Sequence, residues 1–144
     1  NETLSEYNLS EKEFFTIKTE EDVELNAWMM KPTNFDSKKE YPLYMFLYGG
    51  PGSQQVRNSW GWFNYFWYQH LNQLGYIVAC VDNRGTGGKG AEFKKMTYQE
   101  LGKYETIDQF VGHKTLIIMN LHFLAHHPIL LADIKNSNKQ NLRH

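Results

Sequence analysis

The sequence has 144 residues, 41% hydrophobic and 15% aromatic, which suffices for one domain around one apolar core and leaves little room for a second domain. Its 15 basic and 16 acidic residues nearly cancel, which argues against a nucleic-acid-binding surface and against attraction to an anionic membrane. The most hydrophobic stretch, residues 115–134, contains histidines, a proline and an aspartate. It is too polar for a spanning helix, so we expect no transmembrane segment.

Two short runs with strand character lie near the start of the chain. Residues 13–19 and 23–31 are joined by an acidic turn, which predicts a β-hairpin. After a polar loop, residues 42–48 form a nearly continuous apolar and aromatic run, typical of a strand buried on both faces. This run ends abruptly at Gly49-Gly50-Pro51-Gly52.

A helix and another strand follow. Apolar residues recur at helical spacing over residues 62–74, and Gly75 stands where a helix C-terminal glycine is expected. Residues 76–81 form a second apolar run, which makes a βαβ unit with parallel strands and predicts the α/β class. Cys80, the single cysteine, lies in this run and has no intrachain disulfide partner, so we expect it to pack in the core.

The last third of the chain changes in character. Residues 83–90 form a glycine-rich loop, and residues 91–109 are expected to hold one or two short helices. Beyond Phe110 comes an apolar block and then a polar ending, residues 135–141, which is typical of a disordered tail.

Several motifs in register resemble the prolyl oligopeptidase family of serine peptidases, and its dipeptidyl peptidase IV branch matches best. The resemblance covers residues 13–109 in the order and spacing of the family. Its motifs are Leu25-Asn26-Ala27-Trp28-Met29-Met30-Lys31-Pro32, Tyr48-Gly49-Gly50-Pro51-Gly52-Ser53-Gln54, Asp82-Asn83-Arg84-Gly85-Thr86-Gly87-Gly88, Leu101-Gly102-Lys103-Tyr104-Glu105 and Asp108-Gln109.

The resemblance implies a β-propeller in front of an α/β-hydrolase domain that releases dipeptides or tripeptides from peptide N-termini. We therefore expect residues 1–12 to be a linker from a missing propeller and residues 13–110 to be the N-terminal part of a truncated α/β-hydrolase domain. Residues 111–144 are expected to be a divergent tail, not native to the fold. For the full-length protein the resemblance suggests a periplasmic, secreted or cell-surface location and a peptide substrate, and it leaves open whether the protein is a homodimer. The balanced charge predicts no nucleic-acid partner.

Tyr48 is the one site residue that the resemblance carries over. In the family, a tyrosine hydroxyl at the end of the third strand and a backbone N–H form the oxyanion hole, and Tyr48 matches that tyrosine. A donor at the carboxyl end of a strand can stabilise the negative oxygen of a tetrahedral intermediate. The alternative is an ordinary strand tyrosine with its hydroxyl at the rim.

A catalytic serine is missing from this pattern. An α/β-hydrolase needs a serine on a G-x-S-x-G turn and a downstream Asp and His, and no serine of this sequence has glycine at both positions. The family would place this turn about 25 to 30 residues after Tyr104, where the sequence reads Pro128-Ile129-Leu130-Leu131-Ala132-Asp133-Ile134. We therefore predict that the isolated chain is inactive, through truncation or a shifted reading frame. The alternative is a non-catalytic binding or assembly module that pairs with a chain carrying the rest of the hydrolase domain.

Other motifs have simpler interpretations. Residues 85–90 satisfy G-x-G-x-x-G, but no acidic residue follows at the end of a second strand, so a nucleotide-binding half-domain is a weaker third hypothesis. The resemblance gives this loop a structural role, with polar anchoring by Asp82 and Arg84. Six histidines, among them His122, His126 and His127, lack partners at a known ligand spacing, and we expect neither a metal nor a cofactor. Glu105 and Asp108 are interpreted as first-turn acids of a helix.

Overall fold

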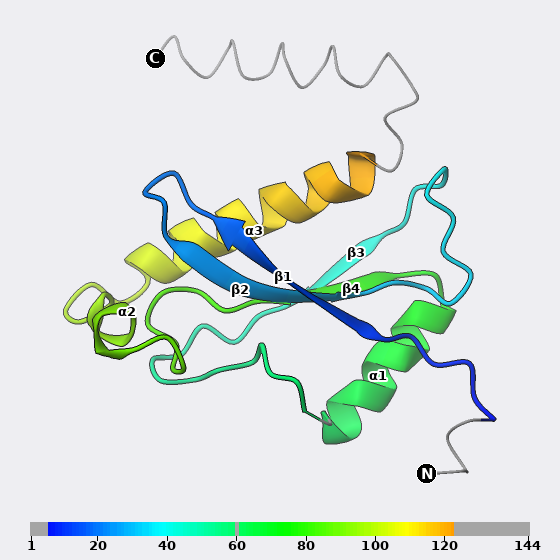
Figure 1. Ribbon diagram of the computed structural model, residues 1–144, viewed down its shortest axis with the longest axis horizontal. Coiled ribbons are helices and arrows are strands. Elements are labelled where there is room, and N and C mark those ends of the chain that lie inside the picture. Colours follow the sequence, from blue (N-terminus) through cyan, green and yellow to red (C-terminus); the bar gives the residue numbers. More distant parts are fainter. Residues whose placement is uncertain (1–5, 60, 123–144) are drawn as a thin grey trace, which may run out of the picture.

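The computed structural model describes residues 6–59 and 61–122, which form a four-stranded sheet with helices on both faces (Figure 1). In chain order the elements are β1 (Lys12–Lys18), β2 (Glu24–Met30), β3 (Leu43–Phe46), α1 (Trp62–Gln73), β4 (Ile77–Val81), α2 (Ala91–Lys95) and α3 (Lys103–His122). The predicted α/β class is confirmed.

The predicted hairpin is formed by β1 and β2. The two strands pair antiparallel, from Lys12 opposite Met30 to Lys18 opposite Glu24. Asp22 takes φ 60 in the turn, a conformation that aspartate tolerates better than most residues. The hydroxyl of Thr19 accepts a hydrogen bond of 3.1 Å from the backbone N–H of Val23 and closes the turn.

The predicted βαβ unit is also confirmed. α1 connects β3 to β4, which pair in parallel from Leu43 opposite Ile77 to Phe46 opposite Cys80. Gly75 follows α1 with φ 88, and its backbone N–H donates to the carbonyl of Asn72 at 3.0 Å. Glycine fits this position because a left-handed residue ends the helix without steric cost.

The strand order β1-β2-β4-β3 places β4 inside the sheet, between a parallel and an antiparallel neighbour. All five residues of β4 are buried, as its continuous apolar run predicts. The four residues of β3 are only half-buried. The prediction that β3 is buried on both faces is therefore wrong, because β3 is an edge strand of the sheet in the described part of the chain.

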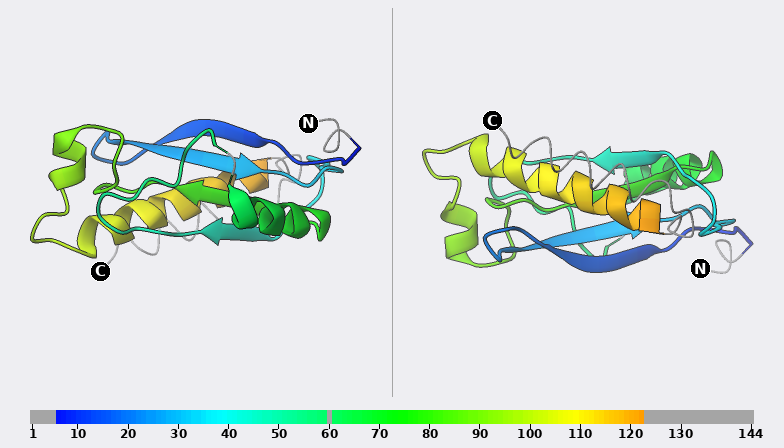
Figure 2. Two further views of the ribbon diagram at one scale, coloured as in Figure 1. Left: turned by 90° about the horizontal axis from the view of Figure 1, so that it is seen from below. Right: turned by 90° about the horizontal axis from the view of Figure 1, so that it is seen from above.

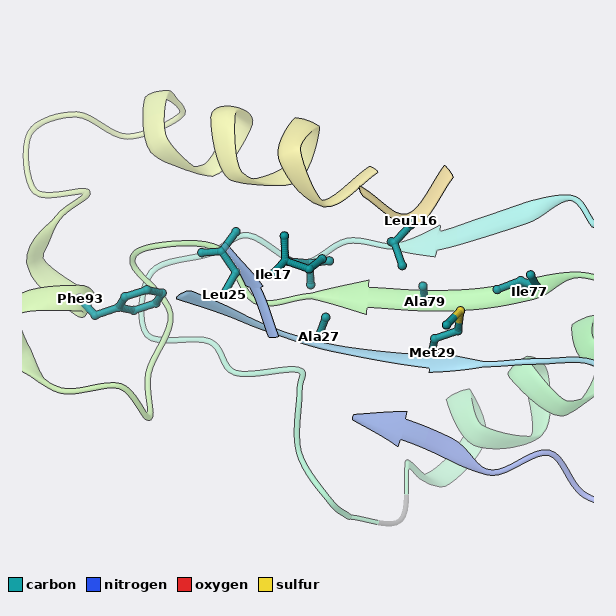
Figure 3. Close-up of a cluster of buried hydrophobic side chains, with 9 residues drawn as sticks. Ile17, Leu25, Ala27, Met29, Ile77, Ala79, Phe93 and Leu116 are labelled. Carbon is teal, nitrogen blue, oxygen red and sulfur yellow. The ribbon is translucent and has the colours of Figure 1, made fainter. Parts of the chain in front are cut away.

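Two apolar layers pack against the sheet. α3 lies over one face and α1 over the other (Figures 1 and 2). Successive side chains of β4 alternate between the two layers: Ala79 packs with Leu116 of α3 (Figure 3), whereas Cys80 belongs to the cluster on the opposite face. Burial raises the pKa of the Cys80 thiol to about 12, and the expectation that Cys80 is a core residue is confirmed.

Helix α3 is longer than the sequence suggests. It continues without a break through residue 110 to residue 122, so the change of sequence character there is not the end of a helix. Gly112 lies in the middle, where an added Cβ would stand 2.9 Å from Cγ2 of Val81. The helix can approach β4 this closely because residue 112 has no side chain. Among the described helices, none has the length and hydrophobicity needed to cross a bilayer.

Candidate functional site

The candidate site lies at the edge of the sheet where the parallel strands β3 and β4 end. The carboxyl ends of parallel neighbours meet at one edge, and in α/β proteins ligands bind there. Tyr48 follows β3 by two residues, and Asp82 follows β4 directly. The loops after these strands therefore form the site together.

Backbone hydrogen bonds join these two loops. The N–H of Gly52 donates to the carbonyl of Gly85 at 2.9 Å, and the N–H of Gly87 donates to the carbonyl of Ser53 at 3.1 Å. Gly88, at φ 89, lies so close to Gln54 that a Cβ there would stand 2.7 Å from the Gln54 amide nitrogen. The glycine-rich loop thus packs against protein atoms, in line with its predicted structural role.

Asp82 anchors the loop that follows β3. Its two carboxylate oxygens accept hydrogen bonds from the backbone N–H groups of Gln55, at 2.8 Å, and Val56, at 3.1 Å. Burial raises the pKa of Asp82, and these two hydrogen bonds act in the opposite direction. The predicted anchoring role of Asp82 is confirmed.

The structure places Tyr48 at the rim, with 58% of its surface exposed. The turn beside it is supported from α3: Nε2 of Gln109 donates to Oδ1 of Asn83 at 2.9 Å, and Nδ2 of Asn83 lies 3.5 Å from the carbonyl oxygen of Gly49. Asn83 is fully buried and an added Cβ on Gly49 would stand 3.1 Å from its Oδ1, so Gly49 is closely packed. Tyr48 is thus exposed to solvent, and its oxyanion role stays a prediction.

Arg84 and Asp108 form a buried ion pair behind the site. Nη2 of Arg84 lies 2.7 Å from Oδ1 of Asp108, and both side chains are almost completely buried. Glu21 in the hairpin turn also binds the guanidinium, and the ring of Tyr104 lies 4.4 Å from its central carbon. The hydrogen bonds to Asp108 hold the pKa of Arg84 above its usual range.

The interpretation of Asp108 as a first-turn acid is therefore wrong. Asp108 lies beyond the first turn of α3, and its carboxylate binds Arg84. The interpretation of Glu105 is correct: this residue lies in the first turn of α3, and its Oε2 accepts a hydrogen bond of 2.9 Å from the N–H of Gly102.

An open apolar groove lies between the edge of β3 and α3, and sequence reasoning missed it. Its volume is about 540 Å³. The groove is lined by Met45, Leu47, Gly49, Glu105, Thr106, Gln109, Phe110 and His113. Phe110 is 69% exposed and lines this groove. No local sequence pattern indicates the groove, because its lining residues come from the end of β3 and from the first half of α3.

In the described part of the chain, the histidines and serines form no second candidate site. Among the described residues, no three His, Cys, Asp or Glu side chains come together in an arrangement that could hold a metal ion. His126 and His127 lie outside the described residues, as does the side chain of His122. The hydroxyl of Ser53 accepts a hydrogen bond of 2.9 Å from Nε2 of Gln55.

Comparison with known proteins points to one family. The model of the prolyl oligopeptidase family matches residues 62–125. This match extends 16 residues beyond residue 109, where the resemblance found from the sequence motifs ends. The dipeptidyl peptidase 4 of Trichophyton equinum is 38% identical over 117 residues, which are 81% of this chain and 15% of the relative. That of Arthroderma otae is 37% identical with the same coverage. The crystal structure of Porphyromonas gingivalis dipeptidyl peptidase 4 is similar with a TM-score of 0.70 and 46% identity, covering 76% of this chain and 15% of that one. The chain thus spans about 15% of the length of these relatives.

Proposed function

The chain belongs to the prolyl oligopeptidase family, and on this premise we propose that it is the front part of the hydrolase domain of a serine exopeptidase of the dipeptidyl peptidase IV type. In this proposal Tyr48 donates a hydrogen bond to the oxyanion while a serine elsewhere in the enzyme attacks the peptide carbonyl. The observation that supports it is the place of Tyr48: exposed, directly beyond β3, beside a glycine turn supported by Asn83. The substrate of the longer protein would be a peptide N-terminus.

We propose further that the isolated chain does not hydrolyse peptides. No serine of the sequence lies in the G-x-S-x-G pattern. An oxyanion donor alone lacks the nucleophile and the base that acyl transfer requires. We also propose residues 1–12 as a linker and residues 13–110 as part of the hydrolase domain. Because the family model also matches residues 111–125, we propose that the divergent tail begins after residue 125.

The first experiment is hydrolysis of a glycyl-prolyl chromogenic amide by the purified chain, with a fluorophosphonate probe to detect an activated serine. A dipeptidyl peptidase 4 serves as the positive control. We expect neither turnover nor labelling. Turnover that the probe abolishes would mean that a serine such as Ser53 is a nucleophile, and the inactive assignment would have to be given up.

The alternative function is a non-catalytic module that pairs with a chain carrying the rest of a hydrolase domain. The observation that favours it is the groove beside the edge of β3, with exposed Phe110. An edge strand offers unpaired backbone groups to another strand.

Co-expression with such a chain separates the two ideas. Restored turnover that falls roughly 10²–10³-fold in Tyr48→Phe, but not in the exposed control Tyr98→Phe, supports the peptidase assignment. A stable complex without turnover supports the module.

A further inference from the structure

A second pocket, of about 150 Å³, lies on the α1 side of the sheet, beneath the chain that leads into α1. Its volume is roughly that of five water molecules at about 30 Å³ each, enough for one small polyatomic ion. The pocket is lined by Lys12, Trp28, Phe46, Gln55, Arg57, Ser59, Gly61, Asn64 and Tyr68. No function derived above uses it.

The charges around this pocket are unbalanced. Lys12 and Arg57 line it, no Asp or Glu does, and neither cation forms an ion pair with a described residue. The charge of Asp82 acts on Arg57, but its carboxylate is occupied by the two backbone N–H groups that anchor the loop. Burial and the neighbouring Arg57 both lower the pKa of Lys12. Bringing two cations together without an anion is unfavourable, and an anion between them would remove that penalty.

The other polar groups of the pocket are suited to an anion as well. Tyr68 is only 4% exposed, and the hydrogen bonds of the described residues include none from its hydroxyl. Burial raises the pKa of Tyr68, which keeps the hydroxyl a neutral donor. Asn64 and Ser59 can donate further hydrogen bonds. Tyr68 lines the pocket, so its hydroxyl can donate to an ion bound there.

We propose that this pocket binds a small oxyanion, a carboxylate or a phosphate, between Lys12 and Arg57 and against the hydroxyl of Tyr68. The planar guanidinium of Arg57 matches the two oxygens of such a group. The Trp28 ring, whose centroid lies 5.1 Å from Nζ of Lys12, stabilises one of the two cations. The proposal does not rest on the peptidase function.

The test is a titration of the purified chain with inorganic phosphate and, separately, with acetate, at constant ionic strength maintained with chloride. Backbone ¹⁵N–¹H spectra report where the ion binds. We expect saturable shifts at Arg57, Asn64 and Tyr68, weakened roughly tenfold or more in Arg57→Gln and in Lys12→Gln. Lys114→Gln, on the exposed side of α3, is the control and should bind as the parent chain does.

Each outcome decides the proposal. Shifts that do not saturate, that chloride reproduces, or that persist unchanged in Arg57→Gln would overturn it. Arg57 is exposed, so its variant is expected to fold and keeps the test valid even if Lys12→Gln does not. The tighter of the two anions identifies the source: acetate points to a carboxylate side chain, phosphate to a free or esterified phosphate.

Discussion

Asp108 accepts hydrogen bonds from both the backbone N–H and the guanidinium of Arg84, a residue that precedes it by 24 positions. One carboxylate thus holds the loop after β4 against α3. Because Asp108 is completely buried, its carboxylate depends on Arg84 for compensation of its charge.

We predict that Arg84→Ala lowers the free energy of unfolding by roughly 3–5 kcal/mol, because it leaves a buried charge uncompensated. Urea unfolding followed by circular dichroism measures the change. Lys103→Ala, which removes the exposed pair with Glu100, is the matched control and should have little effect. Equal effects of the two substitutions would show that burial adds nothing to the Arg84 pair.

Gly85→Ala should destabilise the chain more than Gly102→Ala. Both glycines have φ near 90°, 93 and 86 respectively, so both substitutions strain the backbone. Only at Gly85 would the new Cβ meet atoms, at 2.7 Å from Thr97, whereas Gly102 has open space. We expect an additional loss of roughly 1–3 kcal/mol at Gly85. Thermal unfolding of both variants measures this loss. In the double variant, Thr97→Ala should restore part of the stability that Gly85→Ala removes. No restoration would contradict the steric explanation.

Cys80 should resist alkylation in the folded chain and react on unfolding. Its side chain is fully buried and its pKa is raised to about 12 by burial. The unfolded thiol ionises near its ordinary pKa of about 8.5, so the unfolded state releases the proton first. Below about pH 8.5, the Cys80 thiol should therefore not change the free energy of unfolding. Between about pH 8.5 and 12, the free energy of unfolding should fall as the pH rises. Labelling with iodoacetamide in increasing urea measures the accessibility; Cys80→Ala should lose this part of the alkaline destabilisation.

The outer face of α1 should limit the soluble yield. Phe63, Trp67 and Leu74 are 86%, 50% and 60% exposed, which gives the helix an apolar stripe toward solvent. We predict that Phe63→Gln combined with Trp67→Gln raises the soluble fraction and reduces aggregation, measured by light scattering during expression and concentration. Tyr98→Gln, at an equally exposed aromatic outside the stripe, should change little. If the control has the same effect, the stripe is not the cause.

Local patterns were enough for the hairpin, α1 and the parallel pair β3 and β4, because each depends on periodicity and on glycines within a short window. The antiparallel pairing of β2 with β4 was not predicted, because the sequence of a strand does not specify which distant strand it pairs with. The length of α3 was not predicted, because the family motifs end at residue 109 and the sequence changes character beyond Phe110. Gly112 permits close packing of this helix on Val81.

The candidate site divides in the same way. The place of Tyr48 beyond β3 followed from a motif and a strand end. Two other features could not be predicted: the pairing of Arg84 with Asp108, and the pocket between Lys12 and Arg57. Both depend on residues from distant parts of the chain, which a local sequence pattern does not bring together.

The interior position of β4 has a consequence for synthesis on the ribosome. β3 leaves the ribosome before β4, yet in the described sheet β4 is its only hydrogen-bonded neighbour. A nascent chain that has emerged only as far as α1 can form the hairpin, but its apolar β3 has no strand to join. Until residue 81 has emerged, β3 is exposed to chaperones and to other nascent chains. A stalled translation product that ends in α1 is therefore expected to aggregate readily.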